Sequence, residues 1–394
     1  MEQTPEYRLR DRTPIRKKRI WRIFDRKARS EMGRMDLPFF LLTLVLVVVG
    51  LIMMFSASYA RAFQEKGNAA YFLSRQGIFA LAGTVALLFV STMDYEAWKG
   101  LSLIILPAAL ILLILVLFIG VGEEVGSTRW INLGFTTFQP SEAAKFAVVI
   151  TFATLIAAFR EKMETFAYGV LPFAVILGVI ALLLLKQPHL SATIIICGVG
   201  AAMMFQGGTR FRWFLLLAVV AWIAWSYLTA KGYTARRLSA WRDPFADPSD
   251  SGYQIVQSLY AIGSGGLFGL GFGKSRQKYL YLPEEHNDYI FPIICEELGF
   301  VGATLIILLF ALLIIRGYWI ALHAKDRFGS LLAGGFTTLL AIQVFLNIAV
   351  VTNFLPSTGI SLPFFSYGGT ALVIQLIEMG VILSVSRDGN HNIS

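Results

Sequence analysis

The feature that most constrains this chain is the recurrence of apolar runs about twenty residues long, with the charged residues gathered between them. A run of this length lets an α-helix cross the ~30 Å hydrocarbon core of a bilayer. Apolar residues make up 56% of the chain and charged residues 15%, more apolar surface than the cores of a soluble protein can hold. Cys197 and Cys295 both lie inside apolar runs. The pattern predicts a polytopic membrane protein and excludes a soluble enzyme, a disordered scaffold and a secreted disulfide-rich domain.

Ten apolar segments are expected to be spans, which predicts an all-α fold of about ten transmembrane helices. They cover residues 37–57, 73–91, 101–120, 140–158, 168–185, 190–206, 211–229, 290–315, 330–353 and 368–386. The fifth and sixth are short and only four residues, 186–189, separate them, so this hairpin can fall short of a full crossing. We expect residues 37–387 to form one transmembrane domain.

Basic residues are concentrated before the first span. Twelve of the 34 Lys and Arg lie in residues 1–36. Because short cytoplasmic segments of membrane proteins carry an excess of Lys and Arg, this tail is predicted to be cytoplasmic and to touch anionic lipid. An even number of spans returns residues 388–394 to the same side. The net charge of +9 therefore does not indicate a nucleic-acid partner, and the full-length first span argues against a cleaved signal peptide.

The connection over residues 230–289 is far longer than a link between two helices requires, and loops of this length tend to be functional. Apolar positions at helical spacing over Tyr253–Ile262 predict a short interfacial or re-entrant helix on the extracytoplasmic side. The next run, Gly263–Ser275, is rich in glycine but lacks the spacing of a phosphate-binding Walker A loop. Its glycines allow a close backbone approach. Nearby basic residues suggest either an anionic lipid headgroup or a solvated basic turn: Lys274, Arg276 and Lys278.

Four titratable residues precede the eighth span: Glu284, Glu285, His286 and Asp288. A carboxylate at the mouth of a membrane bundle is partly desolvated, which raises its pKa and makes it a better base. Acidic residues also commonly mark the start of a helix, and His286 with Asp288 gives too few ligands for a metal site. Glu296 lies about two turns beyond Asp288, so a continuous helix would point both side chains the same way. A salt bridge to a neighbouring helix is the alternative for Glu296.

Two further polar constellations border the predicted spans. Arg129 precedes the fourth span, and Glu142 and Lys145 lie at its start. Glu142 and Lys145 can pair on one helix face, or Lys145 can bind an anion in a cavity. Before the last span, residues 356–369 combine prolines, small residues and a Gly-Gly pair. This composition predicts irregular backbone that dips into the membrane, where protein or water must satisfy it.

These strings together resemble the SEDS family (shape, elongation, division and sporulation), the FtsW/RodA/SpoVE group. The similarity is carried by GSTRWINLG with FQPSEAAK, by RLSAWRDPFADPSDSGYQIVQSLYAIGSGGLFGLGFGKSRQKYLYLPEEHNDYIFPIICEELGFVG, and by NIAVVTNFLPSTGISLPFFSYGGTALV. It extends over about residues 37–387 and is nearest the FtsW/SpoVE branch.

The resemblance implies a peptidoglycan glycosyltransferase that polymerises lipid II into β-1,4 glycan strands on the outer face of the bacterial cytoplasmic membrane. Asp288 matches the acidic residue of the family's H-T-D-F element, which is the proposed base for the acceptor's 4-hydroxyl. Undecaprenyl diphosphate would leave with inversion, which calls for positive charge or a divalent cation, Mg or Mn. The implied diphosphate ligands are Arg129, Lys145 and Lys278, and the residues that orient them or hold a cation are Glu142, Glu284 and Glu296. His286 and Ser366 complete the expected substrate-binding set.

The family also implies partners: lipid II and the nascent glycan strand, a class B penicillin-binding protein that supplies the transpeptidase, and other divisome or elongasome membrane proteins. Two other functions remain open from the residues alone. A lipid II flippase would explain intramembrane charges without an external base. A non-catalytic scaffold would position the penicillin-binding protein.

Three positions depart from the family pattern. Asn287 stands where threonine is usual, Asp243 where asparagine commonly precedes the proline, and His189 where a Q-P-D-L element has an acid. His189 puts any carboxylate role of that hairpin in doubt. Glu378, near the middle of the last span, is also unexpected, and pairing with a basic side chain is the default expectation.

Overall fold

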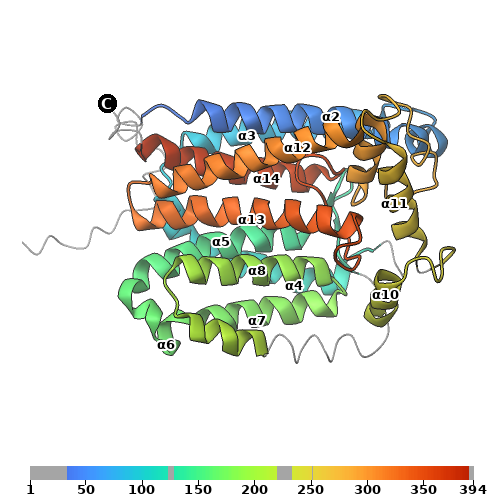
Figure 1. Ribbon diagram of the computed structural model, residues 1–394. Coiled ribbons are helices and arrows are strands. Elements are labelled where there is room, and N and C mark those ends of the chain that lie inside the picture. The colour runs from blue at the N-terminus through green and yellow to red at the C-terminus, as the bar shows by residue number, and fades with distance from the viewer. Residues whose placement is uncertain (1–32, 123–127, 220–232, 251, 390–394) are drawn as a thin grey trace, which may run out of the picture.

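Long apolar helices joined by short connections form a bundle in which successive spanning helices run in opposite directions (Figure 1). The computed structural model describes residues 33–122, 128–219, 233–250 and 252–389. Its α-helices are α2 (Leu37–Lys66), α3 (Tyr71–Ser91), α4 (Ala97–Ile119), α5 (Pro140–Phe159), α6 (Phe166–Gly169), α7 (Leu171–Lys186), α8 (Leu190–Gln206), α10 (Tyr233–Arg242), α11 (Tyr253–Ser264), α12 (Ile290–Leu322), α13 (Arg327–Val351) and α14 (Gly369–Gly389). A 3-10 segment, η2 (Arg160–Glu164), follows α5, and β1 (Ile131–Asn132) pairs antiparallel with β2 (Thr137–Phe138).

The described helices account for nine of the ten expected spans. Eight helical segments within the described ranges are long and apolar enough to cross a membrane, and α8 is a shorter apolar helix of 17 residues. The expected seventh span, 211–229, is helical over 211–219, and its other residues lie outside the described part of the chain. The protein is a polytopic helical membrane protein, as the apolar runs predict.

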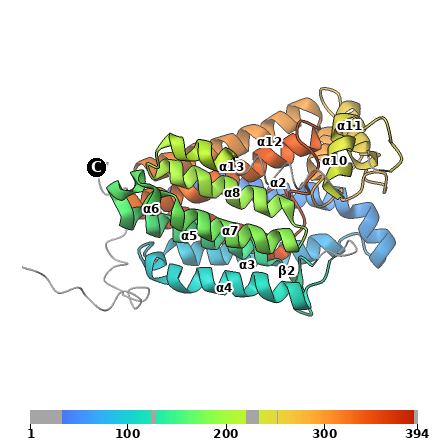
Figure 2. The ribbon, with the colours of Figure 1, turned by 90° about the horizontal axis from the view of Figure 1, so that it is seen from below.

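The helices differ in how much of their surface the rest of the bundle covers. Helices α5, α13 and α14 are buried along most of their length, whereas α3, α4 and α7 expose most of theirs. Figure 2 shows α4 along one edge of the bundle. Charged side chains inside a membrane protein need a polar cavity or a partner, and the central helices can provide both.

The first and last described segments meet at one end of the bundle. Asp36 caps α2 by accepting an amide hydrogen bond in its first turn, and it forms an ion pair with Arg316 of α12. The amide of Asp36 donates to Ser386 Oγ in α14 at 3.1 Å. The amide of Gly33 donates to the carbonyl of Arg387, also at 3.1 Å. Both ends of the described chain therefore lie on one side of the bundle, as an even number of crossings requires.

The opposite end, which we call the loop end, carries α10 and α11 (Figures 1 and 2). Helix α11 confirms the helix expected over Tyr253–Ile262. Helices α2 and α12 have 30 and 33 residues, lengths of about 45 Å and 50 Å, so both exceed the ~30 Å hydrocarbon core. The extra turns at this end place polar residues of α2 and α12 beside the loop helices.

Helix α12 is interrupted at Gly299, whose φ of 67° and ψ of −171° are not helical. The glycine loop, which we define as residues 265–281, packs into this interruption. Its amides donate to the carbonyls of Glu296 and Glu297 at 2.9 and 3.0 Å, and its carbonyls accept from the amides just beyond the break. A Cβ at Gly269 would lie 2.1 Å from the carbonyl oxygen of Glu297. The glycines thus permit two backbones to approach closely, as their sequence predicts.

Candidate functional site

A cavity of about 770 Å³ lies at the loop end. Its walls come from both halves of the chain: from α2, α3, α5, α8 and their connections, and from α10, α11, α13 and the segments that precede α12 and α14. Ten acidic, basic and histidine side chains line it: Arg61, Glu65, Arg129, Glu142, Lys145, His189, Arg237, Glu284, His286 and Asp288. So many ionisable groups in a membrane protein are typical of a space that holds water or a polar ligand.

Helix α5 contributes an ion pair to this cavity. Pro140 begins the helix and Glu142 lies in its first turn. Lys145 Nζ is 2.7 Å from Glu142 Oε2, and both side chains are almost fully buried. Because an ammonium group carries three protons, Lys145 can bind an anion in the cavity without giving up its contact with Glu142.

Arg129 reaches the cavity from the connection between α4 and α5. Trp130 forms an antiparallel bridge with Val121, which folds this connection back on itself. A terminal nitrogen of Arg129 donates to the carbonyl of Pro188 at 2.6 Å. This hydrogen bond ties the α4–α5 connection to the turn between α7 and α8, so two separate connections build one wall.

His189 lies on the same wall, immediately before α8, and is 7% exposed. Its Nε2 is 3.5 Å from Nε2 of Gln139. Burial, and then the positive charges of Arg129 and Lys145, lower the pKa of His189 to about 3. His189 is therefore uncharged at neutral pH, and it contributes polarity to this wall without charge.

The acidic segment before α12 is anchored by Glu285. Arg61 holds the Glu285 carboxylate through two hydrogen bonds, Nε to Oε1 at 2.8 Å and NH2 to Oε2 at 2.9 Å. Burial by itself raises the pKa of Glu285, but the nearby His286, whose Nδ1 is 3.7 Å from Oε1, and the hydrogen bonds and positive charge of Arg61 outweigh burial and hold the pKa below its ordinary value. An ion pair between a partly buried arginine of α2 and a fully buried glutamate therefore anchors the segment that carries the neighbouring acids.

Asp288 lies at the end of this segment and lines the cavity. Its backbone carbonyl accepts a hydrogen bond from Asn347 Nδ2 of α13 at 2.8 Å. Asn347 also donates to the carbonyl of Ile360 at 2.5 Å. A Cβ placed on Gly359 would lie 2.9 Å from Asp288 Oδ2, so the carboxylate rests directly against the turn that follows α13. Asn347 thus anchors the backbone at Asp288, and the carboxylate lies beside the turn after α13.

The segment before α14 is irregular, as expected, and it supports the acidic segment from behind. Ser366 Oγ donates to the carbonyl of Asn287 at 2.7 Å and accepts from the amide of Leu362 at 2.8 Å. The amide of Tyr367 donates to the carbonyl of His286 at 2.9 Å. Ser366 therefore acts on the backbone of the acidic segment, and it is not among the residues that line the cavity.

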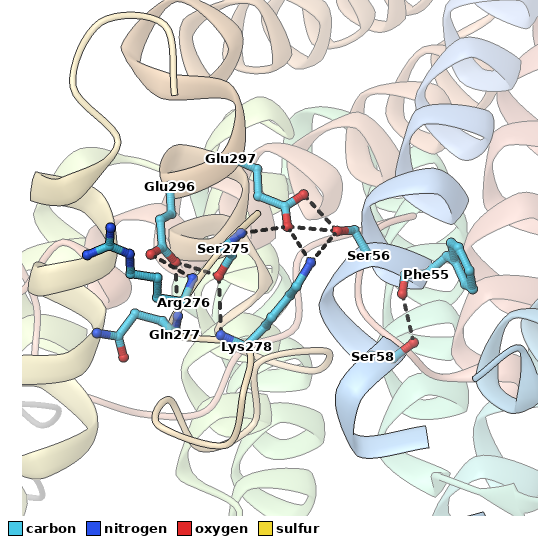
Figure 3. Close-up of polar contacts among 9 residues, drawn as sticks. All are labelled: Phe55, Ser56, Ser58, Ser275, Arg276, Gln277, Lys278, Glu296 and Glu297. Carbon is cyan, nitrogen blue, oxygen red and sulfur yellow. Dashed lines mark hydrogen bonds and ion pairs between the residues drawn. The ribbon is translucent and has the colours of Figure 1, made fainter. Parts of the chain in front are cut away.

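A separate polar network lies between α2, the glycine loop and α12 (Figure 3). Lys278 Nζ is 2.9 Å from Glu297 Oε1 and 3.2 Å from Ser56 Oγ. Glu296 accepts hydrogen bonds from Ser275 Oγ and from the amides of residues 276 and 277. Lys278, Glu296 and Glu297 are at most 2% exposed. We call these residues the closed network: Ser56, Ser275, Lys278, Glu296 and Glu297.

The structure divides the expected site residues into two groups. Six of them line the cavity: Asp288, Arg129, Glu142, Lys145, Glu284 and His286. Lys278, Glu296 and Ser366 do not; the first two belong to the closed network. The expectation that Asp288 and Glu296 share a helix face is wrong, because α12 begins at Ile290 and Asp288 precedes it.

Three charged residues of the cavity were absent from the expected set. Arg61 and Glu65 lie in the part of α2 that extends beyond a twenty-residue span, which is the signal that could have drawn attention to them. Arg237 lies in α10, and a terminal nitrogen donates to the carbonyl of Ser357 at 3.0 Å. Nothing in the spacing of the sequence singles out Arg237.

Two expectations about charge in the bundle find little support. Within the described ranges, no group of three or more His, Cys, Asp or Glu side chains could hold a metal ion. Glu378 of α14 is 3% exposed, and the expected ion pair with a basic side chain is not found among the residues that the structure describes.

The fold and the cavity define a multi-pass membrane protein with a charged chamber at one end, and the sequence assigns it to a family. Residues 36–391 match the FtsW/RodA/SpoVE family, described as "cell cycle protein". The chain belongs to this family. It is 42% identical over 354 residues to stage V sporulation protein E of Bacillus subtilis, covering 89% of this chain and 97% of that protein. It is 40% identical over 359 residues to a probable peptidoglycan glycosyltransferase FtsW of Geobacter sulfurreducens, covering 91% and 96%.

Solved structures share the fold. A chain from a study titled "Structural coordination of polymerization and crosslinking by a peptidoglycan synthase complex" superposes with a TM-score of 0.76 at 27% identity. That match covers 91% of this chain and 99% of the other. The rod shape determining protein RodA of Thermus thermophilus superposes with a TM-score of 0.68 at 27% identity, covering 91% and 98%.

Proposed function

We propose that this protein is a peptidoglycan glycosyltransferase that polymerises lipid II, with Asp288 as the catalytic base. The observation that carries the proposal is the presence of Asp288, Arg129 and Lys145 in the lining of one cavity of about 770 Å³. Family membership and relatives named as probable peptidoglycan glycosyltransferases support the same activity. Glycosyl transfer to a hydroxyl needs both a base for the hydroxyl proton and positive charge beside the leaving group.

In the proposed reaction, Asp288 accepts the proton of the 4-hydroxyl on the acceptor's N-acetylglucosamine. The oxygen forms a bond with C1 of the donor's N-acetylmuramic acid, and the bond from C1 to the diphosphate oxygen breaks. Undecaprenyl diphosphate leaves with its bonding electron pair, and the configuration at C1 inverts from α to β. Arg129 and Lys145 stabilise the charge that develops on the diphosphate, and Glu142 holds Lys145 in position.

We infer that the loop end faces outward in the bacterial cytoplasmic membrane and that both termini are cytoplasmic. When the long connection over residues 230–289 is set aside, since long loops are poor indicators of orientation, the described chain has more basic residues at the opposite end than at the loop end. Ten lie at the opposite end: Arg34, Lys99, Arg160, Lys162, Arg210, Arg212, Arg316, Lys325, Arg327 and Arg387. Six lie at the loop end: Arg61, Lys66, Arg75, Arg129, Lys145 and Lys186. Short cytoplasmic segments carry such an excess. The basic tail, residues 1–32, lies outside the described residues and adds eleven more Lys and Arg by sequence.

The decisive experiment compares chain growth by purified, reconstituted variants supplied with labelled lipid II. Asp288→Asn keeps the size of the side chain but removes the base, so polymer formation should fall by at least about 100-fold. Asp250→Asn is the matched control, because Asp250 is an exposed acid at the same end of the bundle and should leave polymerisation unchanged. Undiminished polymer from Asp288→Asn would contradict the assignment of the base.

The same assay separates the alternatives. A lipid II flippase would move the labelled headgroup across liposome membranes and give no polymer from either version. A scaffold would do neither and would only bind its partner. We propose a class B penicillin-binding protein as that partner for the enzyme, with other divisome or elongasome proteins; the similar chain in a synthase complex that coordinates polymerisation and crosslinking supports this.

A further inference from the structure

The glycine loop exposes an unusual surface at the loop end. Six large apolar side chains of the loop are between 45% and 80% exposed: Leu267, Phe268, Phe272, Tyr279, Leu280 and Tyr281. Lys274 and Arg276 are exposed between them, and residues 264–283 contain no Asp or Glu. We call these eight exposed side chains the loop patch. Aromatic residues next to lysine and arginine, with no acids, are typical of protein surfaces at a membrane boundary.

The position of the glycine loop relative to the bilayer follows from the length of the helix on the other side of the break in α12. Beyond the break at Gly299, residues 300–322 continue as 23 residues of helix, or about 35 Å. This length matches the ~30 Å hydrocarbon core, so the break and the glycine loop lie at the boundary of the bilayer. Helix α2 agrees: Ser56, which contacts the loop residue Lys278, is the twentieth residue of this helix, counted from Leu37.

The loop patch is also held rigidly. Glu296 and Glu297 accept hydrogen bonds from the backbone amides of Arg276 and Ser275 at 3.0 and 3.3 Å. Figure 3 shows the Arg276 side chain pointing away from this network. Within the described part of the chain, neither Lys274 nor Arg276 forms an ion pair. The two cations therefore face outward from a fixed backbone, beside exposed aromatic rings.

Another exposed segment at the same end has the opposite charge. Phe245, in the connection between α10 and α11, is 55% exposed, yet Asp243, Asp247 and Asp250 surround it in the sequence. Anionic lipid surfaces attract lysine and arginine and repel carboxylates. The charge of the two segments therefore distinguishes one that suits a lipid surface from one that suits water.

We propose that the loop patch lies on the membrane surface, with its Phe, Leu and Tyr side chains in the headgroup boundary and with Lys274 and Arg276 bound to the phosphates of anionic phospholipids. This contact holds the glycine loop, and with it the outer part of α12, at a fixed depth. It is independent of the proposed reaction, because none of the eight side chains of the loop patch lines the cavity.

Spin labels test the depth. The full chain, with Cys197→Ala and Cys295→Ala, receives one nitroxide at Phe268→Cys or, as a control, at Phe245→Cys. Each variant is reconstituted alone in vesicles of phosphatidylcholine and phosphatidylglycerol. The label at position 268 should collide with oxygen, which dissolves in lipid, more than with a water-soluble nickel chelate, and the label at 245 should do the reverse. A label at 268 that meets the chelate as often as the label at 245 overturns the proposal and favours a protein partner for this surface.

The charge is tested separately. Enrichment of spin-labelled phosphatidylglycerol over phosphatidylcholine around the protein is measured for the wild type and for Lys274→Gln with Arg276→Gln. Each basic residue near an anionic surface contributes about a fivefold preference, so the double variant should lose at least that much enrichment at this site. Arg212→Gln with Lys325→Gln, at the opposite end, is the control for total charge, and equal enrichment in wild type and loop variant overturns the headgroup contact.

Discussion

Two polar clusters at the loop end use the same kinds of side chain in opposite ways. The closed network buries a lysine and two glutamates against each other, with partners at 3.3 Å or less. The cavity also contains a lysine, several acids and three arginines, but these side chains border a space of about 770 Å³. The side chains of the first cluster fill the space between them, whereas those of the second border a space that a ligand can enter.

This difference predicts that residues of the closed network stabilise the fold and that residues lining the cavity take part in binding or catalysis. Removing one partner of a buried ion pair leaves the other charge without compensation, which destabilises the folded state. Removing a charge that faces a cavity mainly changes what the cavity can bind or stabilise. Variants of the closed network should therefore lose stability, and variants of the cavity should lose activity while the protein remains folded.

The largest effect is expected for Lys278→Met. The substitution keeps much of the apolar stem but removes the ammonium group that Glu297 contacts at 2.9 Å, so folding should lose about 3–5 kcal/mol. The midpoint of thermal unfolding in detergent and the yield of monodisperse protein measure this loss. Lys274→Met, four residues earlier on the exposed side of the loop, is the control and should behave as wild type. A normal midpoint for Lys278→Met would show that the network is not closed.

The next effect concerns activity. Arg129→Gln removes positive charge from the cavity wall, and the rate of lipid II polymerisation should fall by about 10²–10³-fold at saturating substrate. The unfolding midpoint should change little, and Arg129→Lys should restore part of the rate. Arg212→Gln, exposed at the opposite end, controls for total charge. If Arg129→Gln instead unfolds as readily as Lys278→Met, the two clusters do not differ in the way described.

The smallest effect is a dependence of stability on pH through His189. Its pKa is about 3 in the folded protein and about 6.5 when unfolded. Between these values the unfolded chain binds a proton that the folded chain does not, so stability decreases as the pH falls below about 6.5. From about pH 7 to 5 the loss should reach about 2 kcal/mol.

Thermal unfolding at the two pH values measures this loss. His189→Gln should reduce it, whereas His323→Gln, which changes an exposed histidine at the opposite end, should not. The same pH dependence in His189→Gln as in wild type would mean that His189 is not held uncharged in the cavity wall.

Much of the fold follows from hydrophobic length alone, because a span must satisfy its backbone within one helix. Apolar positions at helical spacing correctly predict α11 within the long loop, and the preference of proline for the first helical turn correctly places Pro140 at the start of α5. The sequence pattern does not predict the break in α12, because the backbone groups freed by this break form hydrogen bonds with a loop about thirty residues earlier in the chain. Local pattern carries no information about such a pairing.

The candidate site was only partly predictable for a related reason. Charges near apolar runs mark Arg129, Lys145 and Asp288 as residues that need a polar environment. They mark Lys278 and Glu296 equally well, and the spacing cannot reveal that the closed network satisfies both. Arg61 illustrates the converse: its partner Glu285 lies 224 residues away, so only the folded chain brings the two together.

The contact between the glycine loop and α12 has a consequence for genetics. A Cβ at Gly265, Gly269 or Gly299 would lie 2.0 to 2.2 Å from a backbone atom of the opposing segment, so any substitution there forces the segments apart. None of the three lines the cavity. Random mutagenesis scored by growth would nevertheless collect inactive alleles at these glycines. Sorting alleles first by how much protein reaches the membrane would separate them from alleles that disable the reaction.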